Sequence, residues 1–291
     1  MASLATNFTG FILFFPIGIR RLLFSSSLYL HNPSHFRSKL WYFSDPKWKN
    51  LDLYFLLISL PIVSFSEFFL FLSFSKHPTY RFSFFQQSFV VLAFWVMIIL
   101  IIGFEYFTSY SIFVSESFVF VFGGVVFLLE YSVMDKGISG VADVVYGLLG
   151  GLSLVCAVSC FYLSAKPNAF FAEFLLCCGL VFKGTWLLQI GVSLYTNVFG
   201  LKGCQKISIL SPEIENVDVT CDLDEDNLRG VVMMQLLFTL HAVVVLFLGV
   251  GLFGVLASSR NLRGSEAKGP LLAEIESTDM RICDLSELQM G

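Results

Sequence analysis

The residues most able to bind a ligand or carry out chemistry lie in the middle of one long apolar run, from Leu175 to Thr196. This run carries Lys183, Thr185, Trp186 and Gln189 among apolar side chains. A lysine in the hydrocarbon of a bilayer is so costly that it must face protein or water, and such a residue is a functional candidate by default. The run therefore predicts a buried ion pair or a polar cavity inside a bundle of helices.

Other apolar runs supply polar side chains that could meet this lysine. Glu130 is the first candidate for its carboxylate partner and Glu67 is the second. Two interpretations stay open: a structural lock, in which a carboxylate neutralises the lysine, and a cavity that binds a small polar ligand or an ion. The full candidate intramembrane polar cluster comprises Glu67, Gln87, Glu130, Lys183, Thr185, Trp186, Gln189 and His241.

The elements that must position these residues are membrane-spanning helices. The 291 residues are 56% hydrophobic and only 14% charged, whereas soluble domains are about 25% charged. In lipid every backbone polar group must be paired within the protein, so apolar runs of about 20 residues are expected to be helices. The sequence predicts an all-α, polytopic membrane protein, a bundle of seven transmembrane helices at about 4–24, 51–75, 83–107, 116–134, 139–163, 169–196 and 231–257.

The charges between these spans predict the orientation. With the N-terminus outside the cytosol, eleven Lys and Arg residues fall on the cytosolic side and six on the other. The positive-inside rule then favours an outside N-terminus and a cytosolic C-terminus. This orientation puts most of the polar cluster in the non-cytosolic half of the membrane. It also predicts an acidic non-cytosolic loop at 200–229 and a disordered cytosolic tail at 258–291.

Cysteines and histidines give few signs of metal or redox chemistry. Cys204 and Cys221 both lie in the acidic loop, where an oxidising compartment would permit a disulfide between them. The only histidine inside a predicted span is His241, so we expect no metal site, no cofactor and no catalytic group. The net charge of −4 does not indicate the basic surface that binding to nucleic acid requires. The expected partner is the lipid bilayer, and the oligomeric state stays open.

Several motifs resemble those of a known family. The block from Lys183 to Gly191, KGTWLLQIG, resembles the QGTWxxQIG motif of the transmembrane protein 45 family, also known as domain of unknown function 716. Supporting similarities are the FLLEY segment that contains Glu130, the segment Gln86-Gln87-Ser88, and His241 in the last span. The similarity covers most of residues 4–257, and the long acidic loop and tail are closest to the plant branch.

The resemblance implies an architecture but leaves the chemistry open. The family has no settled biochemical activity, and its plant members are linked only loosely to viral response. Family members tend to carry histidines where this chain has Asn7 and Gln87, and many have glutamine in place of Lys183. The expected protein is a multi-pass membrane protein without an assigned activity, and more a non-enzyme than an enzyme. The alternatives are a transporter or small-ligand-binding bundle, a scaffold or trafficking protein, and a disfavoured degenerate relative of intramembrane metal hydrolases.

Overall fold

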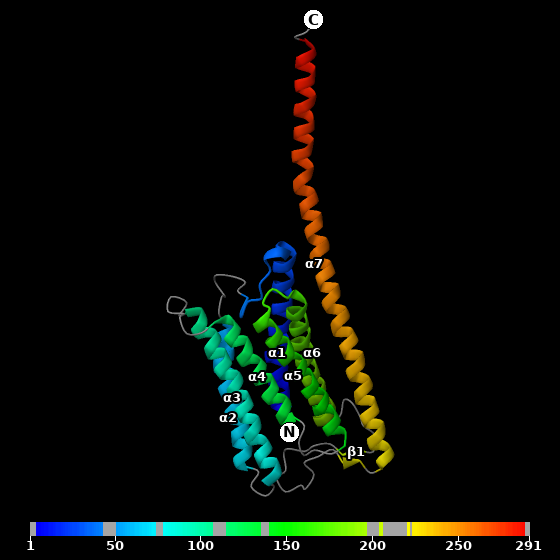
Figure 1. Cartoon of the computed structure of the whole chain (residues 1–291). Coiled ribbons are helices and arrows are strands. Elements are labelled where there is room, and N and C mark those ends of the chain that lie inside the picture. Colours follow the sequence, from blue (N-terminus) through cyan, green and yellow to red (C-terminus); the bar gives the residue numbers. More distant parts are fainter. Residues whose placement is uncertain are drawn as a thin grey trace. The chain divides into compact units, whose positions relative to one another are not determined.

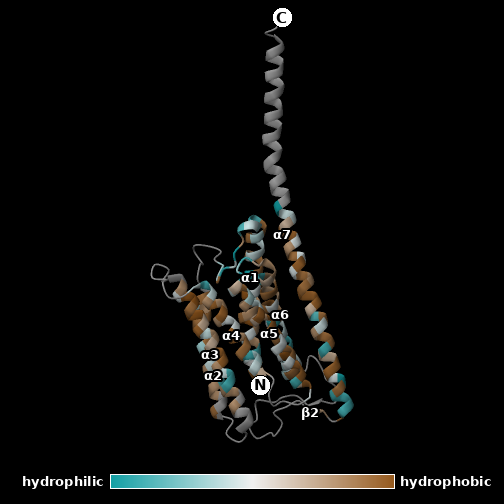
Figure 2. Ribbon diagram, in the orientation of Figure 1, coloured by the Kyte–Doolittle hydropathy of each residue, from teal (hydrophilic) through white to brown (hydrophobic). Residues whose placement is uncertain are grey.

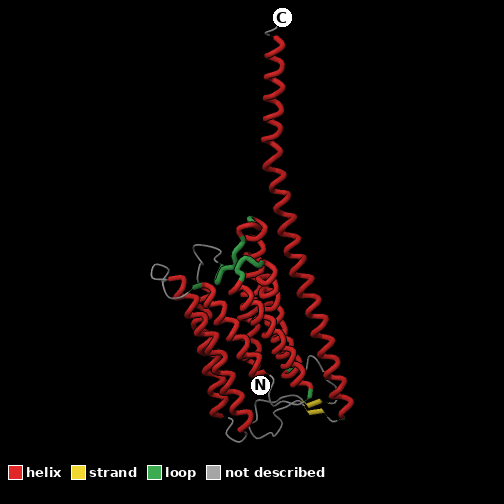
Figure 3. The backbone as a smooth tube through the Cα atoms, viewed as in Figure 1, coloured by secondary structure: helices red, strands yellow, loops and turns green. Residues whose placement is uncertain are grey.

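Seven α-helices make up almost all of the described chain (Figures 1 and 3). The computed structural model describes residues 4–42, 51–73, 78–106, 115–134, 140–196, 204–205, 220–221 and 223–288. The helices are α1 (Leu4–His31), α2 (Leu51–Ser73), α3 (Pro78–Tyr106), α4 (Glu116–Met134), α5 (Val141–Ala165), α6 (Phe170–Tyr195) and α7 (Asp224–Leu288). A 3-10 turn, η1 (Pro33–His35), and an antiparallel ladder of two short strands, β1 (Cys204–Gln205) and β2 (Thr220–Cys221), complete the described elements.

The described helices confirm the predicted class of polytopic membrane bundle. Six of them are long and apolar enough to cross a membrane, and the described apolar part of α2, Leu53–Phe69, is shorter. Apolar residues cover these helices along most of their length (Figure 2). The chain divides into two compact units, Met1–Phe247 and Leu248–Gly291, and α7 contributes to both. All the features described below belong to the first unit.

Within this unit the helices pack in neighbouring pairs. α2 packs on α3, α3 on α4, α4 on α5, α5 on α6, and α6 on α1. Two glycines bring α1 and α6 close together: a Cβ atom at Gly18 would lie 2.7 Å from the backbone nitrogen of Val181, and one at Gly184 would lie 2.7 Å from that of Phe15. Small residues permit such backbone contact in membrane helices. The contact places Lys183 of α6 beside the middle of α1.

The first helix extends beyond its predicted end. The sequence predicted a span at 4–24 with Arg20 and Arg21 at the start of the following loop, but α1 continues to His31 and contains both arginines. The physical reason is that their guanidinium groups are satisfied inside the protein. Arg20 donates to the carbonyl of Tyr42, and Arg21 donates to the carbonyl of Leu40. These charges therefore need not mark the end of a helix.

The last helix also differs from its prediction at both ends. α7 begins at Asp224, inside the stretch predicted as an acidic loop, because acidic residues in a first turn interact favourably with the helix dipole. It continues to Leu288, through the segment for which the sequence predicted disorder. That prediction weighed the polar composition of the tail, whereas many of its residues, such as Glu, Ala, Leu and Lys, are strong helix formers. α3 likewise begins earlier than predicted, at Pro78, because proline is well suited to a first helical position.

Candidate functional site

Lys183 of α6 forms an ion pair with Glu130 of α4, the partner that the sequence favoured. The lysine side chain is fully buried. Its ammonium also donates to Ser153 Oγ of α5 at 2.8 Å, and Ser153 Oγ donates to Glu130 Oε2 at 3.2 Å. Three helices thus each contribute one side chain to a closed polar triad. The lysine and the serine both bind Oε2 of the glutamate.

Aromatic rings also surround the lysine ammonium. The Nζ atom lies 4.7 Å from the ring centre of Phe14, 4.9 Å from that of Phe127 and 5.8 Å from that of Phe94. A cation within about 6 Å of an aromatic face is attracted by the ring quadrupole, most strongly where water is excluded. The rings also contact one another, with 5.3 Å between the centres of Phe94 and Phe127. The ammonium is therefore held by a carboxylate, a hydroxyl and three rings.

A cavity lies beside the triad, among α1, α2, α3 and α4. It encloses about 100 Å³, measured as the space open to the centre of a water molecule. Its walls are mainly apolar, with polar groups from Thr6, Asn7, Thr9, Gln87 and Glu130. A water molecule needs roughly 10–15 Å³ on this measure, so the cavity has room for a small organic molecule. We call it the amide cavity, after Asn7 and Gln87.

Asn7 is the least satisfied polar side chain of this cavity. It is completely buried, and neither its amide nitrogen nor its amide oxygen has a hydrogen-bond partner among the described residues. A buried polar group left without a partner costs about 1–3 kcal/mol. Glu130 adds a second acceptor, because no described side chain bonds its Oε1 atom while Oε2 binds Lys183 and Ser153. The wall of the cavity therefore holds a buried amide without a partner among the described residues and a carboxylate oxygen.

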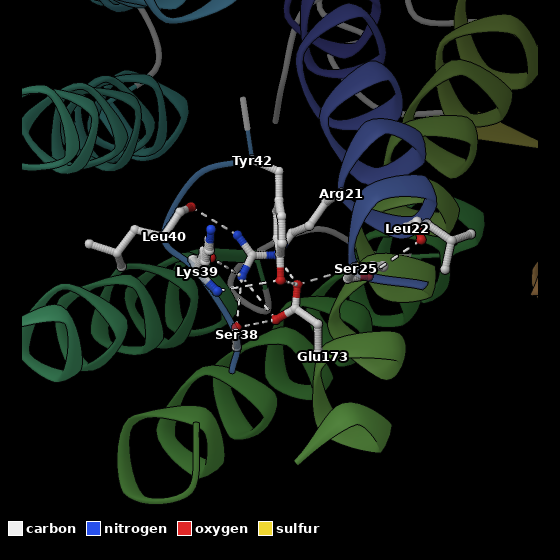
Figure 4. A network of polar contacts seen from close by, with 9 residues as sticks. Arg21, Leu22, Ser25, Ser38, Lys39, Leu40, Tyr42 and Glu173 are labelled. Carbon is white, nitrogen blue, oxygen red and sulfur yellow. Dashed lines mark hydrogen bonds and ion pairs between the residues drawn. The ribbon is translucent and has the colours of Figure 1, made fainter. Parts of the chain in front are cut away.

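A second polar network lies at the opposite end of α1 and was missed by the sequence reasoning (Figure 4). The Glu173 carboxylate of α6 binds Arg21 of α1 through two oxygens, at 2.6 and 2.9 Å. It also accepts hydrogen bonds from Ser38 at 2.5 Å and from Tyr42 at 3.4 Å. Burial and then the neighbouring carboxylate raise the pKa of Tyr42, so its phenol stays protonated and donates. The network ties the segment after η1 to α1 and α6.

The remaining members of the predicted cluster make their contacts apart from the triad. Thr185 Oγ1 lies 2.8 Å from Nε2 of His241, at the contact between α6 and α7. Trp186 packs against the His241 ring there, with 6.2 Å between ring centres, and lies near the carbonyl of Val145. Gln189 donates to Ser193 of its own helix at 3.0 Å. This contact between helices is separate from the triad.

Glu67, the second candidate partner for the lysine, instead accepts a hydrogen bond from Thr6 of α1. The sequence reasoning also missed Ser153 and the aromatic rings around the lysine. A lone serine or phenylalanine in an apolar helix carries no signal of what it faces. The paired signal for the second network was present, because Arg21 and Glu173 are opposite charges that lie inside or at the end of apolar runs.

The cysteines fall into two groups. Cys156, Cys160, Cys177 and Cys178 are free and buried. Cys221 is disulfide-bonded, and it faces Cys204 across the ladder of β1 and β2. The assignment of Cys204 as the disulfide partner stays our prediction. Among the described residues, no group of three or more His, Cys, Asp or Glu side chains could hold a metal ion.

The apolar helices and the polar triad that joins three of them define an integral, multi-pass helical membrane protein. Residues 116–254 match the model of a family described as a family of unknown function, DUF716. This match confirms the resemblance to the family that the KGTWLLQIG block predicted. The match covers Glu130, Ser153, Lys183 and His241, and the plant branch stays a prediction. No curated protein matches the chain.

Proposed function

We propose that this protein is a non-enzymatic, membrane-embedded binding protein for a small apolar molecule with one uncharged hydrogen-bonding head group. The observation that carries the proposal is Asn7, a fully buried amide at the wall of a cavity and without a partner among the described residues. A protein that retains such a group against a loss of about 1–3 kcal/mol usually uses it, because stability and function often trade against each other.

The hydrogen-bonding groups around Asn7 limit the chemical class of the ligand's head group. Glu130 Oε1 can only accept, so the ligand must donate at least one hydrogen bond. Lys183 already neutralises this carboxylate, so a cationic head group would find no uncompensated charge. An anionic head group would meet the carboxylate oxygen directly. A hydroxyl both donates and accepts, and it therefore matches the carboxylate and the amide together.

The apolar walls indicate the rest of the molecule. Leu56 and Leu60 of α2 and Val90 and Phe94 of α3 are among the apolar residues that line the cavity. A hydrocarbon group in this space replaces lipid contacts with similar protein contacts, so binding depends on the head group more than on the hydrophobic effect. The ligand would reach the cavity from the bilayer, where such molecules concentrate.

The orientation proposed from the sequence puts the amide cavity in the non-cytosolic half of the membrane. Arg20 and Arg21 lie inside α1, and without them nine Lys and Arg residues remain on the proposed cytosolic side against six on the other. The excess of Lys and Arg residues therefore stays on the proposed cytosolic side. We propose an outside N-terminus and a cytosolic C-terminus on this ground.

A photoreactive short-chain alcohol, a 1-hexanol with a diazirine at its far end, tests the binding proposal. The purified protein in lipid nanodiscs is irradiated with this probe, and the labelled peptides are mapped. We expect labels on residues that line the cavity, such as Leu60 and Val90, and a loss of these labels in Asn7→Leu. Asn32→Leu is the matched control, because Asn32 is exposed and lies outside the cavity.

The stability of the same variants separates a binding role from a structural one. Asn7→Leu replaces an unsatisfied buried amide with an apolar group of similar size, so its melting temperature should stay equal or rise. A large fall in melting temperature would assign Asn7 a structural role. Unchanged labelling in Asn7→Leu, or labels only on exposed residues such as Ile58, would refute the binding proposal.

A further inference from the structure

A second cavity of about 100 Å³ lies deeper along α1, between the triad and the Arg21 network. Its walls are almost wholly apolar, and they include Gly123, Cys160 and Leu180. Arg21 and Trp41 lie at its far end. The nitrogens of Arg21 already bind Glu173 and backbone carbonyls, whereas the buried indole nitrogen of Trp41 has no hydrogen-bond partner among the described residues. We call this space the inner cavity.

The amide cavity and the inner cavity share one wall. Five side chains line both spaces: Phe14, Ile17, Phe94, Met97 and Ile98. These five side chains form the boundary between the two spaces, and methionine is the most adaptable of them. The two spaces can therefore join without a rearrangement of the bundle.

The part of this wall that can adapt most easily is the contact between Met97 and Gly123. Methionine is unbranched and adapts to irregular spaces better than other apolar residues. Opposite it, Gly123 has no side chain, and a Cβ atom there would lie 3.4 Å from the sulfur of Met97. On the other side, the lysine ammonium holds the rings of Phe14 and Phe127. The lysine therefore fixes the side of the wall at Phe14, whereas the side at Met97 can move.

The two cavities together follow a large part of the membrane thickness. From Asn7 to Arg21 along α1 is 14 residues, which is about 21 Å at the rise of an α-helix. From Gln87 to Ile101 along α3 is the same number of residues, and these also lie at the two ends. The hydrocarbon core of a bilayer is about 30 Å thick. A molecule that fills both spaces must be long, narrow and apolar along most of its length.

We propose that the amide cavity and the inner cavity form one site for a long single-chain lipid with a hydroxyl head group. The head group binds Asn7 and Glu130, and the chain passes between Phe14 and Met97 into the inner cavity. This inference rests on the proposed function, because the head group occupies the same cavity. It adds the chain length of the ligand and the path that the chain takes.

Two photoreactive alcohols of different length test the path. Both carry a diazirine at the end of the chain, and they are 1-hexanol and 1-hexadecanol derivatives. In nanodiscs the short probe should label walls of the amide cavity such as Leu60, and the long probe should label walls of the inner cavity such as Ile101 and Val119. The site of labelling therefore measures how far the chain reaches.

Gly123→Leu blocks the path without touching the head-group site. Its side chain would occupy the inner cavity, so the long probe should lose its labels on Ile101 and Val119 while the short probe keeps its labels on Leu60. Gly147→Leu is the matched control, because a Cβ atom at Gly147 meets nothing within 4 Å. Gly123→Ala provides a milder variant, with an intermediate loss. Unchanged short-probe labelling shows that each variant is folded.

The outcomes separate this inference from the proposed function. If the short probe labels the amide cavity and the long probe labels only that cavity or exposed residues, the single-site inference is overturned and the binding proposal stands. If Gly123→Leu leaves the long-probe labels on Ile101 and Val119 unchanged, the chain takes another path and the inference is also overturned. If neither probe labels either cavity, both proposals fail.

Discussion

The ion pair between Lys183 and Glu130 makes the sharpest energetic prediction. Removing one partner of a buried pair costs about 3–5 kcal/mol, because the other charge stays buried without compensation. In Glu130→Gln the ammonium keeps Ser153 at 2.8 Å and the rings of Phe14 and Phe127 within 5 Å, so we expect a loss near 3 kcal/mol. In Lys183→Gln the buried carboxylate loses its cation and keeps only the serine, so we expect about 5 kcal/mol.

The double variant Glu130→Gln/Lys183→Gln decides whether the pair is coupled. It contains neither charge, and two amides can bond each other, so it should be more stable than either single variant. The free energy of unfolding would be measured in mixed micelles for all four proteins. The surface pair Arg37–Glu116, at 2.8 Å and with the arginine 63% exposed, is the control and should show a coupling of about 0–1 kcal/mol. Additive losses at Lys183 and Glu130 would refute the reasoning.

Two further predictions concern the opposite end of the bundle and the acidic loop. Arg21→Lys keeps the charge but loses the two-point bond to its carboxylate partner and the bonds to backbone carbonyls, so we expect a loss of at least about 1.5 kcal/mol in the same unfolding assay. A loss below about 0.5 kcal/mol would mean that the network is not structural. Peptide mapping of the protein from cells, without reduction, should recover Cys204 linked to Cys221. Both thiols free to alkylation would contradict the disulfide and the non-cytosolic placement of the loop together.

The number and type of helices were predictable because the bilayer imposes them. Apolar runs of about 20 residues can only be helices in lipid, so the bundle followed from composition and run length. The ends of the helices were less predictable where charged side chains find partners inside the protein. Arg20 and Arg21 looked like the end of a span, but their bonds to carbonyls and to Glu173 keep them inside α1. Local composition cannot show that a distant carboxylate will meet them.

The sequence by itself determined the class of the protein and the need of Lys183 to face protein or water, because an uncompensated ammonium cannot remain in hydrocarbon. Only the tertiary structure decided which side chains meet. Helices that are apolar on all sides have no polar face to show how each is rotated, so neighbours are chosen by packing. The close contact at Gly18 and Gly184 sets α1 against α6. That contact brings Phe14 to the lysine, and the same helix carries the buried amide of Asn7 at the wall of the amide cavity.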